Sequence, residues 1–173
     1  MKILGICGSI RQNSSNWSLL KAVQNYYKDY HKDYQWESID LARLPYFDPD
    51  LQYSEQTPAV VKKLRSVAGS CDLIVISTPE YAHGVPGILK NGLEWIFSEE
   101  TQKKPVALIV GSAQGEWARD QLLEILKTMD FLITPEHCLL VKGARTKIKS
   151  DGTFTDIKTQ ELFEKFCESL RGL

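Results

Sequence analysis

The sequence predicts an α/β protein in which one parallel sheet carries helices on both faces. Five short apolar runs alternate along the chain with five stretches whose apolar residues recur at spacings of three and four, which is the pattern of strands alternating with amphipathic helices. Two of the runs, within residues 72–77 and 105–110, contain four or five consecutive apolar residues, as in central strands buried on both faces. The length of 173 residues corresponds to a single domain over residues 1–173.

The predicted elements follow one another along the whole chain. The predicted strands span residues 2–7, 35–41, 72–77, 105–110 and 135–141. The apolar stripes of the predicted helices cover residues 19–30, 60–67, 88–96, 122–129 and 162–170. Thr57 and Pro58 are typical of an N-cap and a first helical residue, and Gly69 is typical of a helix end. Pro86 is expected to start the third helix in the same way.

Right-handed crossovers leave few topologies for five parallel strands, and the flavodoxin-like order 2-1-3-4-5 fits this alternation. In such sheets, ligands bind at the carboxyl ends of the strands, close to the switch point between the first and third strands. The loops with the least ordinary composition, residues 8–16, 78–85 and 111–116, follow the first, third and fourth predicted strands. The topology therefore predicts a ligand site made of these three loops.

Composition and charge exclude several classes of protein. The chain has 21 basic and 22 acidic residues and a net charge of −1, so it lacks the basic patch of a nucleic-acid-binding protein. Its apolar runs are too short to span a bilayer, and the apolar start of the chain has no small-residue cleavage site of a secretory leader. We expect a cytoplasmic protein that binds small molecules rather than nucleic acid or a membrane.

The cysteines and histidines do not form a metal-binding pattern. The four cysteines include no C-x-x-C pair, and His31, His83 and His137 are far apart in the sequence. Three of the cysteines lie in or beside predicted strands and one lies in a helical stretch. Buried, reduced thiols without a metal site are therefore expected.

The first loop has the composition of an anion-binding site. Ser9, Arg11, Ser14 and Asn16 precede the first helix, whose unpaired N–H groups and partial positive charge attract phosphate. An arginine adds a planar fork that matches phosphate oxygens. A capping turn with a solvated Arg11 is the alternative interpretation. The loop contains neither a nucleotide-binding glycine pattern nor the cradle of a cysteine phosphatase.

The second and third loops are less specific. Glu80, Tyr81 and His83 suggest a general acid, a proton donor and a base, although a solvated Glu80 and a His83 without a catalytic role are the favoured interpretation. Prolines and glycines fix the path of this loop, and Tyr81 offers a flat face to a ligand. The small residues of loop 111–116 permit close approach of a planar ligand.

Together, the loops resemble those of the NADPH-dependent FMN reductase family, which includes quinone, azo-dye and chromate reductases. The matching segments are Gly8-Ser9-Ile10-Arg11 with Ser14 and Asn16, Thr78-Pro79-Glu80-Tyr81, and Pro86-Gly87-Ile88-Leu89-Lys90-Asn91 with Trp95. The resemblance covers nearly the whole chain. It implies a flavodoxin-like fold, bound FMN, NADPH or NADH as co-substrate, and a homodimer or a tetramer of dimers.

The resemblance also implies roles for individual residues. It assigns the FMN phosphate to Ser9, Arg11, Ser14 and Asn16. It assigns the isoalloxazine to Pro79, Glu80, Tyr81 and the backbone at Ala82, and its far edge to Ser112 and Gly115. Three positions depart from the family pattern, namely Ala82, where asparagine is frequent, His83, where another aromatic is frequent, and Trp117, where a glycine-rich stretch is common.

The expected function is ping-pong hydride transfer from NAD(P)H through FMN to a quinone, an azo compound, free flavin or a metal oxyanion. Because the flavin carries the chemistry, no side chain is expected to be catalytic. A flavodoxin-like electron carrier and a non-catalytic FMN-binding module are the alternatives. Trp95, Ile96 and Phe97 are more apolar than one buried helix stripe requires, which suggests a dimer formed through the helix that starts at Pro86.

Overall fold

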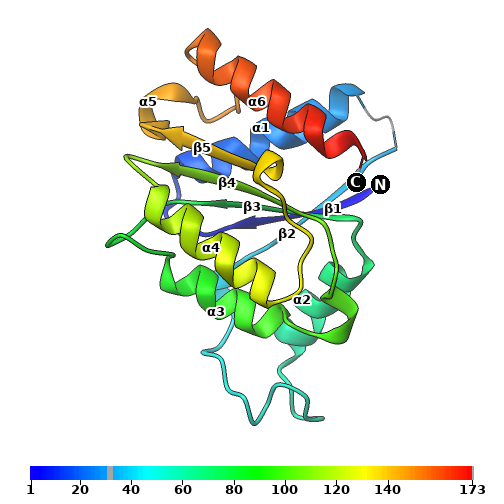
Figure 1. Cartoon of the computed structure of the whole chain (residues 1–173). Helices are drawn as coiled ribbons and strands as arrows, with labels where there is room; N and C mark the ends of the chain where they lie inside the picture. Colours follow the sequence, from blue (N-terminus) through cyan, green and yellow to red (C-terminus); the bar gives the residue numbers. More distant parts are fainter. Residues whose placement is uncertain (31–32, 173) are drawn as a thin grey trace.

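A five-stranded, all-parallel sheet organises the chain (Figure 1), in the computed structural model, which describes residues 1–30 and 33–172. The strand order is β2-β1-β3-β4-β5, as the sequence predicts. The strands are β1 (Lys2–Cys7), β2 (Gln35–Ile39), β3 (Leu73–Thr78), β4 (Val106–Ser112) and β5 (Cys138–Lys142). His31 lies outside the described residues.

Helices cover both faces of the sheet, which confirms the predicted layers. The helices are α1 (Ser15–Tyr30), α2 (Ala59–Ser70), α3 (Gly87–Ile96), α4 (Glu116–Thr128), α5 (Ala144–Lys147) and α6 (Ile157–Ser169). Helices α1 and α6 lie on one face, and α2, α3 and α4 lie on the other (Figure 1). The carboxyl ends of the strands, and the loops that follow them, gather at the left of that view.

The sheet separates two hydrophobic clusters because alternate residues of a strand point to opposite faces. In β1, Leu4 and Ile6 pack with α2, α3 and α4, whereas Ile3 and Cys7 pack with α1 and α6. All six residues of β3 are buried, as predicted for a central strand. Burial raises the pKa of the Cys7 thiol to about 12, so this cysteine beneath the first loop stays protonated at neutral pH.

Several predicted boundaries are wrong because side chains end or shift an element. Strand β2 stops at Ile39 rather than at residue 41, since Asp40 caps a 3-10 turn by accepting a bond from Ala42 N (3.0 Å). Thr57 is not an N-cap. Its hydroxyl lies 2.7 Å from both Leu51 O and Ser54 O, and Pro58 occupies the cap position instead.

Three further boundaries differ from the sequence prediction. Gly69 lies inside α2, which ends one residue later at Ser70, and Pro86 caps α3 rather than being its first residue. Residues 135–137 form a 3-10 turn before β5. The short helix α5 is not predicted from the sequence, because its four residues are too few to show helical periodicity.

Two of the three apolar residues at the end of α3 do not support a dimer interface, whereas Phe97 is half-buried. Trp95 and Ile96 are buried within their own subunit. The Trp95 indole donates to Pro45 O (2.8 Å), and its ring packs edge-on against Phe47, with centroids 5.0 Å apart. Trp95 therefore anchors loop 44–50 to α3.

Candidate functional site

A cavity of about 450 Å³ lies at the carboxyl ends of the strands, where the topology places a ligand site. Loops after β1, β3, β4 and β5 form its walls. The predicted site residues that line it are Arg11, Ser14, Asn16, Pro79, Glu80, Tyr81 and Ser112. Ser9, Ala82 and Gly115 do not line it, and Ala82 lies at the tip of the second loop, between Tyr81 and Gly84.

The first loop ends in a capped helix start. The Ser14 carbonyl accepts a bond from Trp17 N (3.0 Å), and its hydroxyl accepts one from Asn16 N (3.3 Å). Arg11 is exposed, and its guanidinium donates to Asn13 O (3.2 Å) within the same loop. Ser9 is buried, and its hydroxyl accepts a bond from Arg11 N (3.4 Å). The positive end of α1 and the Arg11 cation thus adjoin one end of the cavity.

The Asn16 side chain lines the cavity and also bonds to the ends of two strands. It is 1 % exposed, and its side-chain nitrogen donates to Gly111 O (2.9 Å). Its side-chain oxygen accepts bonds from the Ser77 hydroxyl (2.9 Å) and Gly111 N (3.2 Å). The start of α1 is thereby tied to the ends of β3 and β4. With both acceptor positions of its oxygen in use, Asn16 acts mainly by positioning these loops.

The second loop is a tight hairpin with an unusual backbone. Tyr81 N donates to Gly84 O (3.1 Å), and Gly84 N donates to Tyr81 O (3.0 Å). The two residues between them, Ala82 and His83, have φ angles of +50° and +56°. This is the backbone of a two-residue turn with two left-handed residues, for which asparagine and glycine are preferred. Ala82 therefore carries backbone strain.

We predict that Ala82→Asn stabilises the protein by about 0.5–1 kcal/mol, because the left-handed region costs most L-residues about 1–2 kcal/mol and asparagine tolerates it. Urea unfolding of both proteins measures the difference. Ala82→Val is the matched control, since a β-branched side chain fits this region worse than alanine. An Ala82→Asn variant no more stable than wild type would contradict the interpretation of strain.

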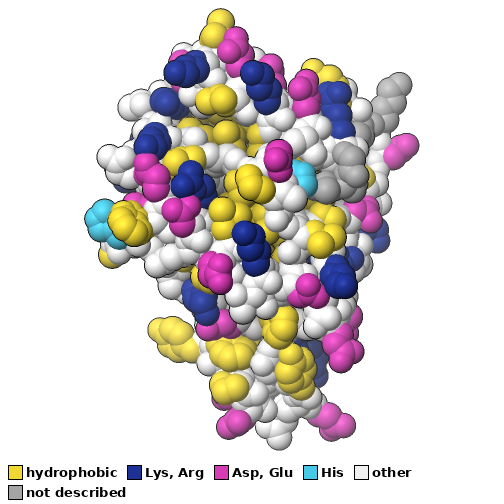
Figure 2. Space-filling view, viewed as in Figure 1, with side chains coloured by type: hydrophobic (Ala, Val, Ile, Leu, Met, Phe, Trp, Pro, Cys, Tyr) yellow, Lys and Arg dark blue, Asp and Glu magenta, His cyan; other side chains and the backbone are white. Residues whose placement is uncertain are grey.

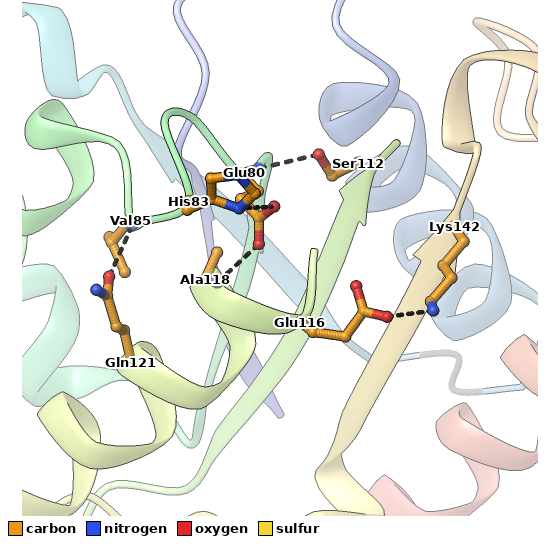
Figure 3. A network of polar contacts seen from close by, with 8 residues as sticks. All are labelled: Glu80, His83, Val85, Ser112, Glu116, Ala118, Gln121 and Lys142. Carbon is orange, nitrogen blue, oxygen red and sulfur yellow. Dashed lines mark hydrogen bonds and ion pairs between the residues drawn. The ribbon is translucent and has the colours of Figure 1, made fainter. Parts of the chain in front are cut away.

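Glu80 is held by the protein, so the expectation that it is solvated is wrong. Its side chain is 7 % exposed, and one carboxylate oxygen accepts a bond from Ala118 N (3.0 Å) in the first turn of α4 (Figure 3). Its other oxygen lies 3.9 Å from His83 Nδ1. A carboxylate at the positive end of a helix is stabilised by the helix dipole. Only the folded chain brings α4 to Glu80, which explains why local sequence does not reveal this role.

Further contacts hold α4 against its neighbours (Figure 3). Glu80 N donates to the Ser112 hydroxyl (3.3 Å), and Val85 N donates to the Gln121 side-chain oxygen (3.1 Å). Glu116 forms an ion pair with Lys142 of β5, and the Lys142 ammonium holds the pKa of Glu116 below its ordinary value. The loops after β3, β4 and β5 therefore form one connected wall.

Gly115 begins this wall, at the start of α4. Its φ is +110°, and a Cβ atom there would stand 2.7 Å from Leu140 Cδ1. The position therefore needs glycine for both conformation and space. This predicted site residue shapes the backbone beside Ser112 instead of lining the cavity.

Residues 143–146, which follow β5, form the fourth wall of the cavity. They are not among the site residues predicted from the sequence. Gly143 N donates to Ser112 O (2.7 Å), which holds this loop beside the third one. Arg145 adds a second cation to the end of the cavity near Arg11. The sequence contained a clue to this wall. Gly143 directly follows the last strand, and the carboxyl ends of parallel strands lie at one edge of the sheet.

Aromatic side chains stand exposed near the open end of the second loop. Tyr81 is 53 % exposed and Trp117 is 61 % exposed. The rings of His83 and Trp117 meet edge to face, with centroids 6.1 Å apart. Two of the departures from the family pattern thus pack against each other beside the cavity.

The residues present fit FMN. The cavity volume lies in the usual range for small-molecule sites, about 300–1,000 Å³. One end has the donors that a phosphate needs, namely Arg11, Arg145 and the start of α1. The lining also includes the flat side chains of Pro79 and Tyr81 and the small residues Gly111 and Ala113, which suit a planar ring.

The described residues contain neither a metal-binding cluster nor a membrane-spanning helix. Among residues 1–30 and 33–172, no three His, Cys, Asp or Glu side chains are grouped closely enough to hold a metal ion. Within the same residues, no helix has the length and hydrophobicity needed to span a bilayer.

Comparisons with known proteins agree with the geometry. Residues 1–146 match the NADPH-dependent FMN reductase family. A potato (Solanum tuberosum) NAD(P)H:quinone oxidoreductase is 28 % identical, over 100 % of this chain and 92 % of that protein. An NAD(P)H-dependent FMN reductase of Pseudomonas aeruginosa is also 28 % identical, over 99 % of this chain and 94 % of that protein.

A solved structure confirms the fold. FerB of Paracoccus denitrificans, a flavoenzyme NAD(P)H:(acceptor) oxidoreductase, superposes with a TM-score of 0.82 and 23 % identity, over 97 % of this chain and 93 % of that one. The family match extends from β1 through the loops after β3, β4 and β5 that line the cavity. The chain is therefore an oxidoreductase that uses FMN and NAD(P)H, and it belongs to the NADPH-dependent FMN reductase family.

Proposed function

We propose that the protein reduces small organic acceptors, quinones first among them, with electrons that NAD(P)H delivers through FMN in a ping-pong reaction. The observation that carries this proposal is the cavity itself, whose lining combines two cations with flat and small side chains. The similar potato protein is a quinone oxidoreductase, which favours a quinone over an azo compound, free flavin or a metal oxyanion. The folded unit in which this happens is one domain over residues 1–173.

The protein's residues bind and orient, whereas bound FMN supplies hydride acceptance and electron donation. We assign the phosphate to Arg11, Ser14 and the first amides of α1, with the buried Ser9 supporting the loop from behind. Pro79, Tyr81 and Ser112 form the wall along the ring. These residues would shield one side of a bound ring from water, and a ping-pong reaction requires that the other side be open to both substrates in turn.

Asn16 and Glu80 hold the loops around the cavity in position. Each is buried and bonded to a neighbouring loop, so each acts by positioning. Neither is assigned a proton transfer. Ala82 contributes its backbone at the hairpin tip, and Gly115 shapes the wall beside Ser112.

The test of this function begins with the purified protein loaded with FMN. Anaerobic NADPH or NADH should bleach its visible absorbance, and a quinone should restore it. Steady-state rates at several fixed quinone concentrations should give parallel double-reciprocal lines. An electron carrier would keep its yellow colour with NAD(P)H, and a non-catalytic module would show neither reaction. Either result would overturn the proposal.

We predict that Glu80→Gln and His83→Ala each lower turnover with a good quinone by less than roughly a hundredfold. A positioned general acid or base is typically worth about 10²–10⁴-fold, and the proposal gives these residues no such task. Glutamine keeps an oxygen that can accept the bond from Ala118 N. Turnover is measured with FMN saturation checked for each variant. A larger loss with FMN still bound would show that one of them is catalytic.

We also propose that the protein forms a homodimer, or a tetramer of dimers, in the cytoplasm. The buried Trp95 does not support a dimer interface. Phe97, Ile125 and Met129, however, line a hollow of about 390 Å³ between α3 and α4. Figure 2 shows this face, on which hydrophobic side chains lie between charges of both signs. Four cysteines without disulfides suit a reducing compartment. A monomeric mass by light scattering at micromolar concentration, with FMN bound, would contradict the dimer.

A further inference from the structure

The phosphate end of the flavin cavity opens into a second, larger groove. This outer groove has a volume of about 1000 Å³ and is lined by residues 11–15, Trp17, Ser18, Lys21, Arg145, Ile148 and Ser150. It shares Arg11, Ser14, Ser15 and Arg145 with the flavin cavity. A ligand bound at these shared residues can therefore extend from one space into the other.

The outer groove is strongly basic in a protein of net charge −1. Arg11, Lys21 and Arg145 line it, and no acidic side chain does. Over residues 1–30 and 33–172, none of the three forms an ion pair with a carboxylate. Lys21 donates only to the neutral Gln24 side chain (3.0 Å). Unpaired cations around a concave surface attract phosphate groups.

An aromatic side chain lies in the same groove. Trp17, in the first turn of α1, lines it and is 36 % exposed. A partly exposed indole beside cations is the platform on which nucleic-acid bases stack, because every base offers a π-face. The hydroxyls of Ser15 and Ser150 add hydrogen-bonding groups suited to a ribose.

We infer that the outer groove is a subsite for an adenosine phosphate, with the adenine on Trp17 and a phosphate near Lys21. Two ligands of this chemistry could supply it. One is the adenylate half of FAD, joined to the flavin phosphate at the shared residues. The other is the adenosine bisphosphate half of NADPH. The choice between them rests on the proposed function, but the subsite does not.

Direct titration tests the subsite without turnover. Adenosine 2′,5′-bisphosphate and 5′-AMP are titrated by calorimetry into the FMN-loaded protein. At least one of the two should bind, and Trp17→Ala should weaken it about 5- to 150-fold, which corresponds to about 1–3 kcal/mol for stacking on an aromatic ring. Trp17→Phe, which keeps a ring, should restore most of the affinity.

Charge is tested separately. Lys21→Ala should weaken the same probe roughly 3- to 10-fold, with a difference that shrinks as salt rises. Lys28→Ala, which removes a positive charge from the other end of α1, is the matched control and should leave binding unchanged. Arg11 and Arg145 are left intact because they also line the flavin cavity.

Two comparisons identify the source. If FAD supplies the adenylate, Trp17→Ala lowers FAD affinity and leaves FMN affinity unchanged. If NADPH supplies it, Lys21→Ala lowers kcat/KM for NADPH more than for NADH. Failure of both probes to bind at millimolar concentration, or equal binding by wild type and all variants, would overturn the subsite. If the protein does not oxidise NAD(P)H but binds a probe through Trp17, the proposed function is wrong and the subsite stands.

Discussion

Arg11→Ala should weaken FMN binding by about 10- to 150-fold and leave riboflavin binding nearly unchanged. The two ligands share the isoalloxazine and the ribityl chain, so the ratio of their affinities isolates the phosphate. A hydrogen bond to a charged group contributes about 1.5–3 kcal/mol, and each 1.4 kcal/mol is a factor of about ten. Isothermal titration of the apoprotein with each flavin measures both affinities.

The geometry of Arg11 supports an effect of this size. Its guanidinium lines the phosphate end of the cavity and has only a loop carbonyl as partner, so it can turn to a phosphate without breaking an ion pair. Because Arg11 is exposed, the preference of wild type for FMN over riboflavin should shrink as salt rises.

Two controls separate this effect from unfolding or general charge. Retained riboflavin affinity shows that the variant still folds around the ring. Lys28→Ala removes one positive charge from the far end of α1 and should leave FMN binding unchanged. Equal affinities of wild type for FMN and riboflavin would show that the first loop does not bind phosphate.

The fold could be predicted from the sequence because its strands are short, apolar and regularly interrupted. The consecutive apolar residues of β3 and β4 match their burial on both faces, and the β2-β1-β3-β4-β5 order is one of the few that right-handed crossovers permit. The ends of elements were less predictable. Strand β2 ends early because Asp40 caps a 3-10 turn, and Thr57 turns its hydroxyl to Leu51 O and Ser54 O instead of capping α2.

The site was predictable as a set of loops but not as a set of contacts. The loops after β1, β3 and β4 could be found because all parallel strands end at one edge. The roles of Asn16 and Glu80 could not, since their partners lie 95 and 38 positions away in the sequence. Local composition marks both as polar loop residues, and only the packing of α1 and α4 turns them into junctions.

Loss of the Asn16 side chain should lower the stability of the apoprotein. Asn16→Ala should destabilise the protein by about 2–4 kcal/mol, since a buried partner left without its bond costs about 1–3 kcal/mol and this side chain has three such bonds. The midpoint of thermal unfolding should fall by roughly 5–15 °C, given about 2–4 °C per kcal/mol for a chain of this length. Urea and thermal unfolding of the apoprotein measure the two quantities.

Asn13→Ala is the matched control, because it removes the same side chain from an exposed position of the same loop and should change stability by less than about 0.5 kcal/mol. Saturating FMN should leave the stability gap between wild type and Asn16→Ala unchanged if both proteins bind FMN equally, and should widen it if the variant binds FMN more weakly, since a ligand stabilises the state that binds it. A variant as stable as Asn13→Ala would show that the Ser77 and Gly111 groups find water in place of Asn16. A stable variant that lost FMN affinity would instead make Asn16 a phosphate ligand. The predicted result, lost stability of the apoprotein, is what a buried residue that ties the start of α1 to the ends of β3 and β4 must produce, because its bonds to Ser77 and Gly111 belong to the fold itself.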